Sequence, residues 1–364
     1  MDDAEIPQTN KMYIPNKSER QEGETFWVSH QPFLASRGYM LRPRYHPDWI
    51  PSWKSNPHPR GFYEDQHVIH DRNAWRIIDA IRLSDGCKVV LKAVSLLGDD
   101  YELTIAHFLS HPALRDDSRN RAIPLLDVVY LPGVKDVALI VMPMFRCFLT
   151  PSFHCRIEFI ELFRQLLGGL EFMHIFNIAH RDISVNNVLM DHRRVMPKGY
   201  HFGLRFSHDG IEINLPTERR CLAGPVDYYF IDFQYSQCFP EGHDKALVSG
   251  IVGQRVPEMK NSNDVCYNPF KADVYQLGTT MLDEFETYTG LDDFKPLLHS
   301  MVSVDPDKRP SASDALAQFE AIVSRSSKVS MTWRIWSNTF CDQWIPWFWN
   351  RFLYFVFPPC RPFV

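Results

Sequence analysis

The pattern of apolar and polar residues predicts strands in the first half of the chain. Residues 75–83 and 87–94 flank the turn Ser84-Asp85-Gly86, and Asp-Gly is a strong hairpin signal. Residues 137–142 form a continuous apolar run, as expected for a strand that is buried on both faces. The first two segments therefore predict a β-hairpin, and the third predicts a further strand.

Two further segments have helical character. Residues 99–110 begin with Asp99 and Asp100 and are followed by His111-Pro112; acidic residues suit the first turn of a helix because of its dipole. Residues 156–174 repeat apolar residues at helical spacing, which predicts a helix of the core.

Three segments have less regular patterns. Residues 1–25 are polar and are expected to be loose at their start. Residues 26–55 mix aromatic residues with prolines, which predicts an irregular segment packed on a folded lobe, with an exposed docking patch as the alternative. Residues 191–225 are polar and rich in turn residues, which indicates an inserted hairpin or loop.

The end of the chain is aromatic. Residues 333–357 carry several tryptophans and phenylalanines, interrupted by Asp342, Asn350 and Arg351. The segment is expected to pack on the folded protein or on a partner, to lie in a membrane interface as a peripheral contact, or to be disordered. No apolar run reaches the roughly 18 residues that a membrane-spanning helix needs.

Composition narrows the function classes. The chain has 364 residues, 45% of them hydrophobic, which suits one two-lobed domain or two small ones. Its formal net charge is -5 and it has no long basic run, so no nucleic-acid partner is predicted. The acidic start has no apolar core, so it does not predict a secretory signal.

The cysteines predict a reducing compartment. All eight are scattered, and no C-x-x-C pair is present, so the sequence predicts free thiols and no zinc site. We therefore expect a cytoplasmic location, with a nuclear or peripherally membrane-associated one as the alternative.

The stretch with the clearest chemistry is His180-Arg181-Asp182-Ile183-Ser184-Val185-Asn186-Asn187. It has the form H-R-D-x-x-x-x-N of the protein-kinase catalytic loop. A carboxylate at Asp182 could orient an acceptor hydroxyl and take its proton. The amide oxygen of Asn187 could ligate magnesium, which prefers hard oxygen donors.

Further motifs follow in the order of the protein-kinase family, which the chain resembles over roughly residues 65–325. The nearest likeness is to the fungal protein-kinase-like proteins with an H-R-D-I-S catalytic loop. The motifs are Val90-Leu91-Lys92, Asp232-Phe233-Gln234, Val256-Pro257-Glu258, Asp273-Val274-Tyr275-Gln276-Leu277-Gly278 and Asp305-Pro306-Asp307-Lys308-Arg309-Pro310.

The resemblance implies an α+β, two-lobed fold. A small antiparallel β lobe with one helix would occupy residues 61–145. A larger, mainly helical lobe would occupy residues 146–326 and contain the insert at about 191–225. Residues 1–60 would be an N-terminal extension, and residues 327–364 an aromatic tail.

The resemblance also implies roles for individual residues. Lys92 would contact the ATP phosphates and pair with Glu102, with Asp99 and Asp100 as alternative partners. Asp232 would be the second magnesium ligand, beside Asn187.

Other roles follow from the same likeness. Backbone groups of residues 143–145, including Met144, would bind adenine, with Met142 at the entrance of a deep pocket. Asp273 would hold the catalytic-loop backbone, and Glu258 would pair with Arg309.

Several positions depart from the family pattern. Gln234 replaces the glycine of D-F-G, and Ser184 replaces a lysine of the catalytic loop. Leu247 and Ile251 stand where threonines are usual, so regulation by phosphorylation of this loop is not predicted. Residues 62–85 contain no glycine, so the glycine-rich phosphate loop is missing and the phosphates would be held mainly by Lys92 and metal.

The sequence therefore predicts ATP- and Mg²⁺-dependent transfer of the γ-phosphoryl group to a hydroxyl, on serine or threonine of an unknown protein substrate. Two alternatives remain open: a pseudokinase that acts as a binding scaffold, and a kinase of small molecules.

Overall fold

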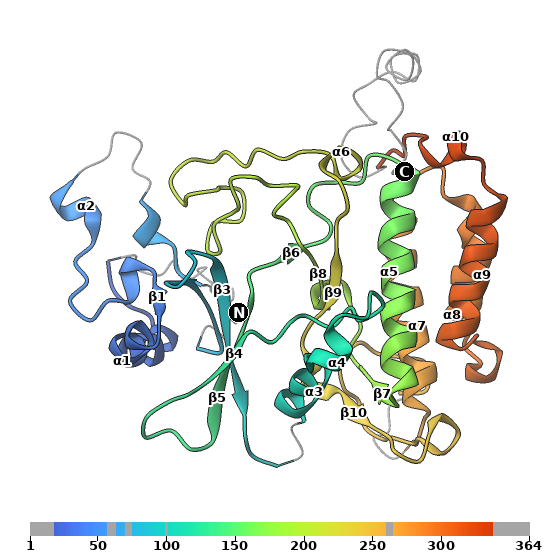
Figure 1. Ribbon diagram of the computed structural model, residues 1–364, viewed down its shortest axis with the longest axis horizontal. Coiled ribbons are helices and arrows are strands. Elements are labelled where there is room, and N and C mark those ends of the chain that lie inside the picture. Colours follow the sequence, from blue (N-terminus) through green and yellow to red (C-terminus); the bar gives the residue numbers. More distant parts are fainter. Residues whose placement is uncertain (1–17, 57–62, 70–74, 99–100, 260–264, 338–364) are drawn as a thin grey trace, which may run out of the picture. The chain divides into compact units, whose positions relative to one another are not determined.

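The computed structural model describes residues 18–56, 63–69, 75–98, 101–259 and 265–337. The chain divides into two units, shown together in Figure 1. Unit 1 comprises residues 1–88 and 200–214, and unit 2 comprises residues 89–199 and 215–364. The predicted loose start and most of the aromatic tail lie outside the described residues. Among the residues that are described, no helix is both long and apolar enough to cross a membrane.

Unit 1 combines short helices with two paired strands. Strand β1 (Tyr39–Leu41) is antiparallel to β2 (Ile77–Arg82), and Tyr39 lies opposite Arg82. After β2 the chain turns as predicted: the Cys87 carbonyl accepts a 2.8 Å hydrogen bond from the Arg82 amide. The helical elements are α1 (Glu22–Ser36), η1 (Pro43–Tyr45), α2 (Ser52–Ser55) and η2 (Glu64–Gln66).

Helix α1 corrects the prediction of an irregular segment. It spans 15 residues although Pro32 lies inside it. The Gln21 amide donates a 2.7 Å hydrogen bond to the Glu24 carboxylate, which satisfies one free donor at the start of the helix. Trp27 is fully buried, and this burial offsets the hydrogen bond that a proline removes. The burial of Tyr39 and Tyr45 likewise confirms that the aromatic residues of this segment pack in the protein.

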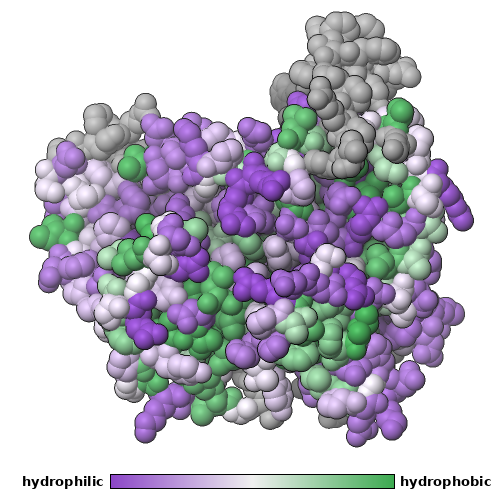
Figure 2. Space-filling model, viewed as in Figure 1, coloured by the Kyte–Doolittle hydropathy of each residue, from purple (hydrophilic) through white to green (hydrophobic). Residues whose placement is uncertain are grey.

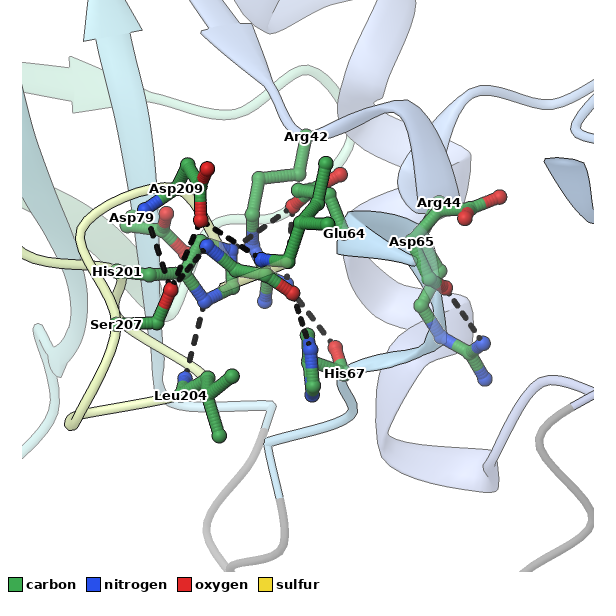
Figure 3. A network of polar contacts seen from close by, with 12 residues as sticks. Arg42, Arg44, Glu64, Asp65, His67, Asp79, His201, Leu204, Ser207 and Asp209 are labelled. Carbon is green, nitrogen blue, oxygen red and sulfur yellow. Dashed lines mark hydrogen bonds and ion pairs between the residues drawn. The ribbon is translucent and has the colours of Figure 1, made fainter. Parts of the chain in front are cut away.

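Two buried arginines organise the polar interior of unit 1 (Figure 3). The Arg44 guanidinium donates to both carboxylate oxygens of Glu24, at 2.5 and 2.9 Å, and to the Asp65 carbonyl at 3.2 Å. Arg42 donates to the Asp79 carboxylate at 2.9 Å and to the His67 carbonyl at 3.0 Å. Buried charges persist in proteins when they are paired in this way.

Part of the predicted insert folds with unit 1. His201 Nε2 lies 3.0 Å from Glu64 Oε1, and His67 Nε2 lies 2.6 Å from the Gly210 carbonyl oxygen (Figure 3). Over residues 191–225 the structure has turns, bends and the short helix α6 (Arg220–Ala223), with no strand. The insert is therefore a loop rather than a hairpin.

The first part of unit 2 contains three antiparallel strands and two helices. Strand β3 (Lys88–Ser95) pairs with β5 (Val137–Pro143), which also pairs with β4 (Asp127–Tyr130). The core of β5 is buried on both faces, as predicted. Helix α3 (Glu102–Leu109) follows β3, and α4 (Pro112–Arg115) begins directly after His111.

The rest of unit 2 is mainly helical. Helix α5 (Arg156–Ile175) confirms the predicted core helix and packs along α9 (Ala312–Arg325), as Figure 1 shows. The other helices are α7 (Pro269–Phe285), α8 (Lys295–Met301) and α10 (Lys328–Met331). Short strands form two small antiparallel sheets: β6 (Arg146–Cys147), β8 (Val188–Met190) and β9 (Tyr228–Phe230), and β7 (Ile178–Ala179) with β10 (Gln237–Cys238). The predicted α+β class is confirmed.

The surface mixes polar and apolar residues. Hydrophilic side chains cover much of the face in Figure 2, and hydrophobic side chains gather mainly in its lower half. Helix α3 and strand β4 occupy that part of the view in Figure 1, and they expose Phe108 and Tyr130.

A buried ion pair joins two distant motifs of unit 2. The Arg309 guanidinium donates to both oxygens of the Glu258 carboxylate, each at 2.7 Å. The Arg309 side chain is fully buried and that of Glu258 is 12% exposed. The pair expected from the sequence is therefore present, with the geometry in which arginine binds carboxylate most strongly.

We expect Glu258→Ala to destabilise the protein by about 3–5 kcal/mol, because it leaves the Arg309 charge buried without its partner. Urea unfolding, followed by circular dichroism, measures this loss. The control is Arg119→Ala, which breaks the exposed Arg119–Asp117 pair and should cost less than about 1 kcal/mol. Equal losses in the two variants would contradict the structural role of the Glu258–Arg309 pair.

Candidate active site

The centre of the site is Lys92, in the middle of β3. Its ammonium nitrogen lies 2.5 Å from Glu102 Oε1 and 2.7 Å from Asp232 Oδ1. Glu102 is the first residue of α3, and Asp232 follows β9. The strand turns Leu91 and Ala93 into the core, so the alternation of a strand places the lysine on the opposite face. Two consecutive elements, β3 and α3, thus meet a segment 140 positions after Lys92 at one charged group.

Charge compensation keeps this group ionised. Burial opposes the charge of Lys92, but Glu102 and Asp232 outweigh it and hold the Lys92 pKa above its usual value. Burial also opposes ionisation of Asp232, yet the charge and hydrogen bond of Lys92 leave the Asp232 pKa below its usual value. An opposite charge within hydrogen-bonding distance has this effect on both partners.

The chain turns sharply at Asp232. Its φ is 65°, in the left-handed region, which only a minority of non-glycine residues adopt. The next three residues, Phe233–Tyr235, form a 3₁₀ turn. Gln234 therefore has a helical backbone conformation, and the side chain that replaces the glycine of the motif is accommodated without a positive φ.

The carboxylate of Asp182 is bound through both of its oxygens. Asp182 Oδ2 accepts a 2.9 Å hydrogen bond from Asn187 Nδ2, which also donates to the Asp182 carbonyl at 2.8 Å. Asp182 Oδ1 accepts from the Gln254 amide at 2.8 Å. Burial is the largest influence on this carboxyl and raises the Asp182 pKa above its usual value, although these hydrogen bonds oppose the rise.

Asp273 on α7 holds the backbone of this loop. Its carboxylate is fully buried and accepts hydrogen bonds from the amides of His180, at 2.8 Å, and Arg181, at 2.6 Å. This supports an unusual backbone at Arg181, whose φ is 67°. The role expected for Asp273 from the sequence is thus present as a contact.

His180 supports the loop from within the core. Burial lowers the His180 pKa, so the imidazole is neutral near pH 7. Its Nε2 lies 3.0 Å from the Ile231 carbonyl, and its Nδ1 lies 3.3 Å from the Asp182 amide. These contacts fit a tautomer in which Nε2 donates and Nδ1 accepts. The histidine thereby links the loop that carries Asp182 to the segment between β9 and Asp232.

Sequence reasoning missed two supporting residues. Gln276 lies one turn after Asp273 on α7; its amide oxygen accepts from the Ile183 amide at 3.0 Å, and its nitrogen donates to the Gln254 carbonyl at 2.7 Å. The i, i+3 spacing places both residues on one helix face, and this signal could have found Gln276.

Gly253 lies against Asp182: a Cβ built there would be 2.5 Å from Asp182 Oδ1. Its role depends on a tertiary contact that the sequence does not show.

The predicted adenine region follows β5. Lys92 pairs across the sheet with Ile140, so Met142, two residues later, lies on the same face of the sheet as Lys92. Met142 and Met144 are both buried. Binding of adenine by residues 143–145 stays a prediction.

Other sequence predictions concern Asp99, Asp100 and Leu247. Asp99 and Asp100, the other possible partners of Lys92, lie outside the described residues. Leu247, in the segment where the family often carries a phosphorylated threonine, is 63% exposed.

Comparison with known proteins gives matches to kinases over part of the chain. The chain is 25% identical to the serine/threonine-protein kinase ELM1 of Saccharomyces cerevisiae over 142 residues, which cover 35% of this chain and 20% of that protein. It is 29% identical to the serine/threonine-protein kinase US3 of human herpesvirus 2 over 112 residues, covering 29% and 21%. No family model matches the chain.

The match to a third relative covers a larger share of that protein. The chain is 31% identical to a probable casein kinase II subunit alpha homolog of Encephalitozoon cuniculi over 126 residues, which are 33% of this chain and 40% of that protein. Over these segments the chain is similar to protein kinases. The matched segments span 20% to 40% of the length of these relatives.

The donor set of the kinase-like site fits magnesium. Both hydrogen bonds of the Asn187 side chain use its nitrogen, so its amide oxygen is the atom able to reach a metal. Only one oxygen of Asp232 bonds to Lys92. A carboxylate oxygen and an amide oxygen are hard donors of the kind that Mg²⁺ prefers.

We expect Gly253→Ala to disrupt the position of Asp182. Gly253 has a φ of 59°, and its new Cβ would meet Asp182 Oδ1 and the Arg181 carbonyl oxygen at 2.5 and 2.6 Å. The chain around Gln254 must then move, and the amide that binds Asp182 moves with it. Urea unfolding is expected to show a loss of stability larger than backbone strain alone causes.

The matched control is Gly250→Ala, with a φ of 87° and no atom within 4 Å of the added Cβ. This variant carries the backbone strain without the clash, at a cost of about 1–2 kcal/mol. If both variants lose the same stability, the close approach of Gly253 to Asp182 does not constrain the loop.

Proposed function

We propose that the protein is an ATP- and Mg²⁺-dependent phosphotransferase of the protein-kinase type. It would transfer the γ-phosphoryl group of ATP to a hydroxyl, on serine or threonine of a protein substrate. The observation that carries the proposal is the position of the Lys92 ammonium between the carboxylates of Glu102 and Asp232. The names of two relatives, both serine/threonine-protein kinases, support the acceptor class.

In this proposal Asp182 is the base. The acceptor oxygen forms a bond to the γ-phosphorus while the bond from that phosphorus to the β,γ-bridging oxygen breaks. ADP leaves, and the acceptor proton passes to the Asp182 carboxylate. Asn187 and the Gln254 amide hold this carboxylate in one orientation, and a fixed orientation is what phosphoryl transfer requires of its base.

Lys92, Asn187 and Asp232 would hold the nucleotide. Lys92 would bind the α- and β-phosphates, and Glu102 would keep the ammonium in place from α3. Magnesium, bound by Asp232 and Asn187, would neutralise charge on the phosphates. Because residues 62–85 lack glycine, these contacts would provide most of the phosphate binding.

A binding scaffold without catalysis is the second candidate. The missing glycines favour it, because glycine lets backbone amides approach phosphates closely. Substitution of the proposed magnesium ligand Asp232 and of the proposed base Asp182 distinguishes the two functions, since a scaffold needs neither residue.

We expect ATP to raise the melting temperature of the protein only when magnesium is present, because a ligand that binds the native state stabilises it by mass action. Asp232→Asn should abolish the magnesium-dependent part of the shift. Asp292→Asn, a change at an exposed aspartate, should leave the shift intact. The absence of any shift at millimolar ATP in the wild type would contradict the proposal and favour the scaffold.

We expect Asp182→Asn to lower turnover by about 100- to 10,000-fold, the usual contribution of general base catalysis, while ATP binding persists.

In the wild type, activity should fall as the pH drops through the pKa of Asp182, since the base is lost on protonation. Burial raises this pKa, so the fall should begin at a higher pH than an ordinary aspartate gives. Phosphate transfer to a generic protein acceptor, followed with labelled ATP, measures both effects. Unchanged turnover in Asp182→Asn would exclude Asp182 as the base.

A further inference from the structure

A second cluster of ligating side chains lies at the start of α5. His154, Cys155, Glu158 and Cys221 each offer a ligand atom, and these atoms all lie within 4.8 Å of one another. Cys155 immediately precedes α5, Glu158 is in its first turn, and Cys221 is in α6. Figure 1 shows α6 beside this end of α5. We propose that the cluster binds a structural zinc ion, separate from the proposed phosphotransfer site.

The distances suit a tetrahedral site. Zinc binds cysteine sulfur at about 2.3 Å and histidine nitrogen at about 2.0–2.1 Å, so neighbouring ligand atoms are roughly 3.3–3.8 Å apart. Cys221 Sγ and His154 Nδ1 are 3.8 Å apart. The other separations exceed the tetrahedral range by at most about 1 Å, a difference that small side-chain rotations remove.

Four protein side chains would fill the tetrahedral site, as in structural zinc sites; three of them are buried and His154 is partly buried. Cys155 is fully buried, and Cys221 and Glu158 are 3% and 4% exposed. Two thiolates, one imidazole and one carboxylate form a donor set that suits zinc and does not suit magnesium or calcium, which require oxygen ligands.

The charges balance once zinc is bound. Two thiolates and the Glu158 carboxylate carry three negative charges. Arg220 is also buried, and its Nη1 lies 3.8 Å from Glu158 Oε2. A divalent cation together with the Arg220 guanidinium neutralises the cluster, so the buried charges are compensated as low-dielectric surroundings require.

Backbone contacts align the ligands. Glu158 accepts a 2.7 Å hydrogen bond from the His154 amide and a 2.9 Å bond from the Cys221 amide. The carboxylate thus holds the two ligand-bearing segments together while it faces the cluster. Cys155 lies at the start of a 20-residue helix, where the helix dipole favours the thiolate that binds metal.

The position indicates what the ion would do. Helix α6 lies near the end of the polar insert. The segment after α10 pairs with residues around the start of α5: the Arg156 amide donates to the Trp333 carbonyl at 3.0 Å, and the Ile335 amide donates to the His154 carbonyl at 3.1 Å. Zinc at the cluster would join the end of the insert to α5, next to the first part of the aromatic tail.

The sequence predicted no zinc site because its cysteines are not paired. Cys221 is 63 positions from Glu158 and 67 from His154, so no short motif contains all four ligands. The simplest competing explanation is a small apolar cluster, since Cys155 and Cys221 also pack with Ile157 and Met331.

The test is the metal content of the full-length protein. We expect protein produced with zinc in the medium, and then passed over a chelating resin, to retain about one zinc ion per chain by elemental mass spectrometry. Cys155→Ser and Cys221→Ser should each weaken zinc binding at least about tenfold, as loss of a ligand or of its support does. Cys266→Ser, at an exposed thiol outside the cluster, should retain wild-type zinc.

A spectroscopic measurement on the wild type covers the case in which the serine variants do not fold. Cobalt(II) exchanged into the protein should show the absorption of sulfur-to-metal charge transfer, and thiol-specific alkylation of Cys155 and Cys221 should be slower with metal than without. Three results would overturn the proposal: wild-type protein without zinc and without the cobalt spectrum, a disulfide between Cys155 and Cys221, or the same zinc affinity in Cys221→Ser as in the wild type. Failure of ATP binding would leave this proposal unaffected, because the two sites share no residue.

Discussion

The proposed site depends first on one buried carboxylate. Asp273 is fully buried on α7 and binds the backbone amides of His180 and Arg181. These bonds support the left-handed conformation of Arg181, which directs the next residue, Asp182, toward Asn187 and Gln254. A buried carboxylate is stable only when donors surround it, so the same requirement that fixes Asp273 also fixes the loop. The loop thus has the conformation that the proposed phosphoryl transfer needs.

Electrostatics explains the other half of the site. Lys92 keeps its charge in a largely buried position because two carboxylates, from α3 and from the end of β9, lie within 2.7 Å of it. Lys92 in turn compensates the negative charge of each carboxylate, so the three segments stabilise one another. Asp232 lies in this cluster with one oxygen bonded to Lys92, and a bound nucleotide and metal would have to share or replace that contact. Opposite charges therefore lie close together in this site, and a bound nucleotide would change its net charge.

The insert at residues 191–225 has two attachments of different kinds. Its middle, residues 200–214, belongs to unit 1, where histidines and buried arginines form a polar network (Figure 3). Its end, α6, belongs to unit 2, where Cys221 meets His154, Cys155 and Glu158. A long polar loop has little apolar surface to bury, so polar contacts, and in our proposal a metal ion, must hold it in place.

The sequence by itself determined the α+β class, the main strands and helices, and the residues of the kinase-like motifs. These follow from short-range periodicity and from motifs whose members are close together, as in the hairpin around Gly86 or the pattern from His180 to Asn187. Only the tertiary structure decided how distant segments meet. Helix α1 forms despite Pro32 because Trp27 is buried, Gln234 is tolerated because the left-handed residue is Asp232, and Gly253 is needed because Asp182 lies against it. The cysteine–histidine cluster was likewise decided only by the tertiary structure. Its members come from two separate segments, and only the packing of α6 on α5 brings their side chains together.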